Sequence, residues 1–226
     1  MSTLRQSHLR VNRAKEKLAL LNRAIERARK AALKTAAEQS DLHARKEPLD
    51  KFSGQLWDET RLLISEFALH ARVALDYVVF ALATRDSGSE QKYTRFPINE
   101  SPEEFARNRT RCLKHLTDEH VAMIERFQPY KGRHLLAPLL ILHRFSNRDK
   151  HRELVHISFE SVGHQDPEFH ARPPTIGITK MEVNIGRSFE VLVHEHGLEV
   201  ENLPKALADI LTQVSEIVDD FDRVLG

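Results

Sequence analysis

The sequence predicts a mainly helical α+β fold: a helical bundle with a long N-terminal helix, a small antiparallel sheet and a C-terminal helix. Over the first two thirds of the 226 residues, apolar residues recur at three- and four-residue steps, which is typical of amphipathic helices. From about residue 153 they alternate, as in half-buried strands, and the helical period returns near the end. A block of helices followed by a block of strands favours α+β over a parallel α/β sheet.

Residues 1–47 are predicted to form a separate element, a helix from about Leu4 to about Leu42. This stretch has no glycine or proline and is rich in strong helix formers. Every seventh position forms an apolar seam: Leu4, Val11, Leu18, Ile25 and Ala32. Because a single stripe on a long helix cannot bury itself, we expect this helix to drive assembly or to serve as a basic arm.

Residues 48–226 are predicted to form one α+β domain, with a helical core over 53–152, the sheet over 153–200 and the last helix over 203–225. The first helix of this core should run from about residue 53 to 84. Its apolar stripe is widened by five residues, so we expect much of it to be interior: Leu62, Leu69, Val73, Val79 and Phe80.

Helix-capping signals place the remaining helices. Ser101, followed by Pro102 and by Glu104, predicts a helix start with a capping box, and Thr117 predicts another. A further apolar helix should extend from about residue 135 to 151, with Pro138 near its start. Asn202 should cap the last helix.

Three strands are expected between these last two helices, at 155–159, 176–183 and 189–193. The turn around Gly186 should join the second and third as a hairpin.

Several function classes lack support in the sequence. The single cysteine, Cys112, rules out a disulfide within the chain and a CxxC zinc site. There is no phosphate loop, GxGxxG or GxSxG motif, and no apolar run approaches the roughly 20 residues of a membrane span. His194 and His196 could share a strand face, but no third ligand has a suitable spacing. We therefore expect a cytoplasmic protein without a membrane segment, cofactor or metal.

Charge is distributed unevenly along the chain. Residues 1–46 carry 12 basic and 4 acidic side chains and residues 92–152 carry 13 and 7, whereas residues 153–226 are acidic. Two basic blocks beside an acidic tail indicate either a polyanion such as RNA or DNA, or self-association between unlike patches. Arg23, Arg27 and Lys30 are the candidate nucleic-acid contacts in the first block.

The densest polar cluster spans residues 143–152, where an apolar helix ends. Arg144, Arg148 and His151 would share a helical face, and Asn147 lies one turn before His151. A histidine beside two guanidinium groups suits metal-free cleavage of a phosphodiester: His151 would move the proton, and Arg144 and Arg148 would stabilise the phosphoryl charge. Asp149 and Lys150 would support them. The alternative is that basic residues here simply complement the helix dipole.

A second candidate pair is Arg72 and Asp76, one turn apart in the most apolar helix. A buried arginine with an aspartate partner is often purely structural. The functional alternative is that one of the two reaches the Asn147–His151 segment and orients it.

Four elements within residues 60–155 resemble a family of uncharacterised bacterial proteins: Arg72 with Leu75-Asp76, Phe96-Pro97-Ile98, Gln128-Pro129-Tyr130, and Asn147 through Arg152. More distantly, Arg144 and His151, with six residues between them, resemble the Arg-x(4–6)-His element of HEPN helical bundles. Phe145 stands where that group usually has a polar residue. The resemblance implies a metal-independent ribonuclease, many of which act as dimers.

Two functions therefore stand side by side. One is a HEPN-type metal-independent endoribonuclease. The other is a non-catalytic interaction protein that oligomerises through its N-terminal helix and binds a polyanion or an acidic partner. In both, a homo-oligomer is expected.

Overall fold

A computed structural model describes residues 4–38, 54–132, 137–150, 156–163, 187–195, 198–200 and 202–226. For the strands, and for residues 28–29, 31–38, 54–57 and 148–150, only the main chain is described. The helices are α1 (Arg5–Glu38), α2 (Gly54–Ser87), α3 (Pro102–Cys112), α4 (Asp118–Arg126), α5 (Pro138–Lys150) and α6 (Leu203–Leu225), with a 3₁₀ turn, η3 (Pro129–Lys131). The strands are β1 (His156–Gly163), β2 (Arg187–Glu195) and β3 (Leu198–Val200).

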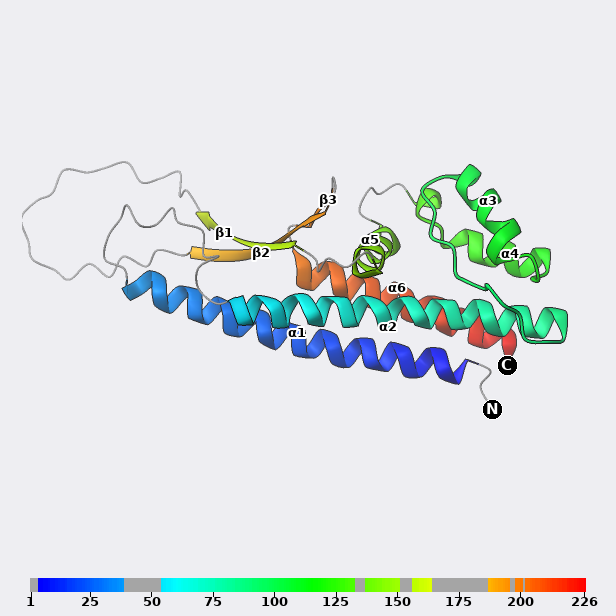
Figure 1. Cartoon of the computed structure of the whole chain (residues 1–226), viewed down its shortest axis with the longest axis horizontal. Coiled ribbons are helices and arrows are strands. Elements are labelled where there is room, and N and C mark those ends of the chain that lie inside the picture. The colour runs from blue at the N-terminus through cyan, green and yellow to red at the C-terminus, as the bar shows by residue number, and fades with distance from the viewer. Residues whose placement is uncertain are drawn as a thin grey trace, which may run out of the picture.

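Helices α1, α2 and α6 lie side by side along the length of the molecule, and α5 crosses them (Figure 1). Helices α1 and α2 are antiparallel, since Arg27 pairs with Glu59 and Lys17 pairs with Glu66. Helices α3 and α4 cover one end, near both chain termini (Figure 1).

The heptad seam of α1 is buried inside the chain over its first 21 described positions, against α2 and α6. Leu4, Val11 and Leu18 of the seam are buried, together with the second heptad row, Ser7, Ala14 and Leu21, and the adjacent Ala24. The apolar stripe expected to drive assembly is thus covered by the chain's own helices over this part. The prediction that the chain forms an oligomer stays a prediction.

Helix α2 is the central helix of the bundle. By length and composition alone, residues Asp58–Ser87 could cross a membrane, but 56% of the most apolar window is buried inside the protein. The burial of this helix and the pairing of Arg72 with Asp76 within it are those of the core helix of a bundle.

One face of α2 differs from the expectation of a largely interior helix. Leu62, Leu69 and Phe80 are 52%, 46% and 37% exposed. These residues fall on one helical face, because spacings of seven and eleven residues return to nearly the same angle. The sequence pattern predicted that these apolar residues are interior, but no other described element covers this face fully.

The capping residues behave largely as the sequence predicts. The side-chain oxygens of Ser101, Thr117 and Asn202 accept hydrogen bonds from main-chain N–H groups three residues later. The Glu104 carboxylate accepts from the N–H of Glu100, one residue before the expected cap. Helix α5 begins at Pro138, in keeping with the preference of proline for a first helical turn.

The predicted α+β class is wrong: the interpretable body of the protein is helical. Every residue of the described hydrophobic core lies on a helix or on a connection between helices. The strands form an antiparallel ribbon of order β1-β2-β3, registered from His156↔His194 to Gly163↔Arg187. A sheet that defines a fold class forms a layer of the hydrophobic core. This short ribbon contributes no residue to the described core.

The structure describes the pairing of two of the three expected strands. Strand β2 pairs with β1 on one side and with β3, through Val193↔Val200, on the other. The predicted strand 176–183 lies outside the described residues, so its expected hairpin with 189–193 stays a prediction. Alternation marked residues 155–159 and 189–193 as extended, and the structure pairs these two segments with each other.

Candidate anion-binding site

The site begins with the ion pair between Arg72 and Asp76 on α2. Their Nη2 and Oδ1 atoms are 3.1 Å apart, and Arg72 is 5% exposed. The same Asp76 oxygen accepts the main-chain N–H of Phe96 at 2.9 Å, and Arg72 Nη2 donates to the Phe96 carbonyl. The pair expected from the spacing is therefore formed, and it clamps the 96–98 segment onto α2.

A second residue fixes the same segment from the other side. Gln128, which is 2% exposed, accepts the N–H of Asn99 at 3.0 Å and donates to the carbonyl of Pro97 at 2.9 Å. Side chains from elements far apart in sequence thus hydrogen-bond to the main chain of this segment and give it a defined position.

Above this segment is a pocket of about 700 Å³ between α2, α3, α5 and residues 95–99. Four arginines line it: Arg72, Arg95, Arg107 and Arg111. Glu104 is the single carboxylate among its described lining residues. The volume falls within the usual range for small-molecule sites, and the charge of the wall is strongly positive.

The arginines on the pocket wall are available for a ligand. Arg107 and Arg111 lie one turn apart on α3 and are exposed. Neither of them, nor Arg95, forms an ion pair with any carboxylate in the described part of the chain. By contrast Arg109, between them in sequence, is 2.7 Å from Asp118 and does not line the pocket.

Arg72 contributes a buried donor without an acceptor. Its Nη1 atom is buried and has no hydrogen-bond partner among the described residues. Burial lowers the pKa of Arg72, Asp76 opposes that effect, and the nearby charge of Arg95 lowers the pKa further. An anion in the pocket would satisfy the unpaired donor and offset the repulsion between the two guanidinium groups.

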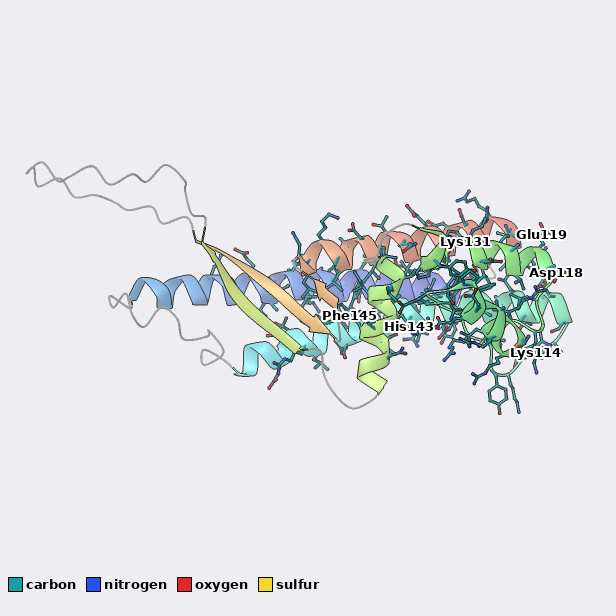
Figure 2. All side chains as sticks on the ribbon, turned by 90° about the horizontal axis from the view of Figure 1, so that it is seen from above. Lys114, Asp118, Glu119, Lys131, His143 and Phe145 are labelled. Atoms are coloured by element: carbon teal, nitrogen blue, oxygen red, sulfur yellow. The ribbon has the colours of Figure 1, made fainter. Side chains whose placement is uncertain are left out.

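Helix α5 supplies an imidazole and an amide to the same pocket. Asn147 Nδ2 is 2.9 Å from His143 Nε2, one turn earlier, and both residues line the pocket. Figure 2 shows His143 on the side of α5 toward α3, with Phe145 on the other side. Asn147 is one of the candidate catalytic residues named from the sequence, whereas His143 is not.

The other residues of the predicted cluster are not brought into the pocket by the described structure. Arg144 does not line it, and its Nη2 is 3.9 Å from Glu100 Oε1. For Arg148, Asp149 and Lys150 only the main chain of α5 is described, and His151 lies outside the described residues.

The candidate nucleic-acid contacts of α1 lie elsewhere. Arg27 pairs with Glu59 at 2.9 Å, and Arg23 and Lys30 are exposed. Since Glu59 precedes Arg72 by 13 residues on α2, these side chains are roughly 20 Å from the pocket along the helix. Two basic surfaces are thus separate.

Sequence reasoning missed Arg95, Arg107, Arg111 and His143. A signal for two of them existed: Arg107 and Arg111 are four residues apart on a predicted helix within a basic block. These two residues share the pocket with residues of α5 because of the path that α3 takes, and local sequence patterns do not encode that path.

The fold and the pocket define a helical-bundle protein with an arginine-lined pocket. Among the described residues, no group of three His, Cys, Asp or Glu is placed to hold a metal ion. No protein-family model, curated protein or solved structure matches the chain.

Proposed function

We propose that this protein binds a phosphate-bearing ligand in the arginine pocket. The observation that carries the proposal is the convergence of four guanidinium groups, one with a buried unpaired N–H, around a cavity with one carboxylate. Guanidinium groups bind phosphate through paired hydrogen bonds, and several of them can each engage a different phosphate oxygen.

RNA is the ligand class that we favour, and metal-independent cleavage of its phosphodiester is the reaction. The His143–Asn147 pair supports this reaction, because it places an imidazole among the arginines, where it could transfer a proton. Stabilisation of the phosphoryl charge then falls to the pocket arginines in place of Arg144. His151, one helical turn after Asn147 in sequence, is the second candidate acid or base. We place this activity in the cytoplasm.

Binding is tested by fluorescence anisotropy with a labelled single-stranded RNA at increasing salt. An Arg107→Ala/Arg111→Ala variant should bind more weakly, and its salt dependence should fall by about 1.4 in log–log slope, about 0.7 per lost contact. The matched control is Arg109→Ala, which removes a charge from the same helix but pairs with Asp118 outside the pocket. Equal losses in both variants would show that the pocket has no special role.

Cleavage is tested by incubating the RNA with the protein and a metal chelator. The wild type should degrade it, and His143→Ala or His151→Ala should abolish degradation while RNA binding persists. Degradation that stops with chelator would reject the metal-independent reaction. RNA that binds but stays intact would restrict the protein to binding.

The separate basic surface of α1 has its own test. Charge reversal of Arg23, Arg27 and Lys30 should weaken RNA binding regardless of sequence if the strand extends along α1. Unchanged affinity would confine RNA to the pocket end of the bundle.

A second candidate function is assembly without catalysis, favoured by the exposed apolar face of α2. Leu62, Leu69 and Phe80 on that face are the kind of residues that homo-oligomers cover. Leu69→Glu should then lower the mass measured by light scattering without unfolding the chain. A wild-type mass equal to one chain would exclude this function.

A further inference from the structure

The pocket lining includes a second residue with a buried polar atom that has no hydrogen-bond partner among the described residues, and this atom is an acceptor. Asn99 lines the pocket and is 5% exposed, and its Oδ1 atom is buried without a hydrogen-bond partner in the described part of the chain. Its main chain is held by Gln128 at 3.0 Å, so the position of the residue is fixed. Asn99 is thus a fixed residue of the pocket lining whose side-chain acceptor has no described donor.

A phosphodiester group alone cannot complete this wall. An amide oxygen accepts hydrogen bonds only, and the free oxygens of an ionised phosphodiester also only accept. Arg72 Nη1, by contrast, is a donor that a phosphate oxygen satisfies. The complement of the two unpaired atoms is a single ligand with an anionic group and an O–H or N–H group.

The two unpaired atoms border the same short segment. Arg72 holds the carbonyl of Phe96, three residues before Asn99, and Asp76 holds the N–H of Phe96. Within the proposed ligand class, a ribonucleotide carries both an anionic group and such a donor. In a ribonucleotide that donor is the 2′-hydroxyl beside the 3′-phosphate, and this hydroxyl distinguishes RNA from DNA.

We infer that the pocket takes one ribonucleotide unit, with its phosphate at the arginines and its 2′-hydroxyl donating to Asn99 Oδ1. The inference rests on the proposed phosphate binding and adds to it the residue that selects ribose. Asn99 then acts as a specificity residue that orients the sugar.

The test is isothermal titration of the full chain with inorganic phosphate, adenosine 3′-monophosphate and 2′-deoxyadenosine 3′-monophosphate. The ribonucleotide should bind about tenfold more tightly than the deoxynucleotide, as expected for one hydrogen bond to a buried acceptor. In Asn99→Ala the two nucleotides should bind equally. The matched control is Gln213→Ala, since Gln213 Oε1 on α6 is also buried and unpaired but lies outside the pocket lining; it should keep the tenfold preference.

The melting temperature of Asn99→Ala shows whether the Asn99 side chain already has a hydrogen-bond partner. Because the Asn99 oxygen has no partner to lose, Asn99→Ala should melt at or above the wild-type temperature. A variant that melts far lower would show that the amide is already hydrogen-bonded, which overturns the inference. Equal binding of both nucleotides by the wild type also overturns it, but leaves phosphate binding in place. Failure of all three ligands to bind would reject the inference and the proposed function together.

Discussion

Replacing Asp76 by alanine should destabilise the protein by about 3 kcal/mol. The change leaves the Arg72 guanidinium, 5% exposed, with the Phe96 carbonyl as its described acceptor. It also removes the acceptor of the Phe96 N–H. Breaking a buried ion pair costs about 3–5 kcal/mol, and the 28% exposure of the Asp76 side chain places this pair at the lower end.

The assay is thermal and urea unfolding of Asp76→Ala beside Glu59→Ala. For a chain of this size about 3 kcal/mol corresponds to a fall in Tm of roughly 6–12 °C. Glu59 and Arg27 form an ion pair whose side chains are 50% and 56% exposed, so its loss should cost about 1 kcal/mol or less. Two variants with the same small effect would refute the idea that the Arg72–Asp76 pair clamps the 96–98 segment.

Three further predictions concern other parts of the bundle. Leu21→Ala should lower the free energy of unfolding by about 2–5 kcal/mol because Leu21 is fully buried. The control Leu20→Ala, at a 44% exposed position, should cost far less. Equal urea midpoints for the two variants would contradict the packing of α1 within the chain. Burial acts to raise the pKa of Asp86, but hydrogen bonds from His120 and Thr117 outweigh it and lower the pKa below its usual 3.8. The stability that this group contributes is therefore present above that value and lost as the pH falls through the lower folded pKa, and Asp86→Asn should weaken the pH dependence of urea unfolding below about pH 4. Gln128→Leu should weaken phosphate binding measured by titration, since it removes the hydrogen bonds to Pro97 and Asn99; full affinity would show that Gln128 does not position the pocket wall.

The helices were predictable from local physics. The apolar stripe of α6 and the caps at Ser101, Thr117 and Asn202 are set by residues within one or two turns, and the structure has them where the sequence places them. The α+β class failed because alternation reveals an extended segment, not whether it joins the core. The sequence correctly identified the seam of α1 as a buried stripe. The periodicity alone does not show whether this stripe packs against another chain or against α2.

The candidate site was predictable only in part. The spacing of Arg72 and Asp76 is local, so their ion pair could be expected. The hydrogen bond from the Phe96 N–H to Asp76 joins residues 20 positions apart, so no local pattern predicts it. The presence of Arg107 and Arg111 in the pocket lining depends on the path of α3. The sequence pattern pointed to the dense cluster 143–152, whereas the pocket is lined mostly by α3 and residues 95–99, with two residues from α5 and one from α2.

The most direct test of the phosphate site is a crystal structure of the protein grown with inorganic phosphate. The account predicts a bound ion within hydrogen-bond distance of Arg72 Nη1 and in contact with Arg107 or Arg111. An ion bound only to exposed basic residues of α1, with the arginine pocket empty at saturating phosphate, would contradict it.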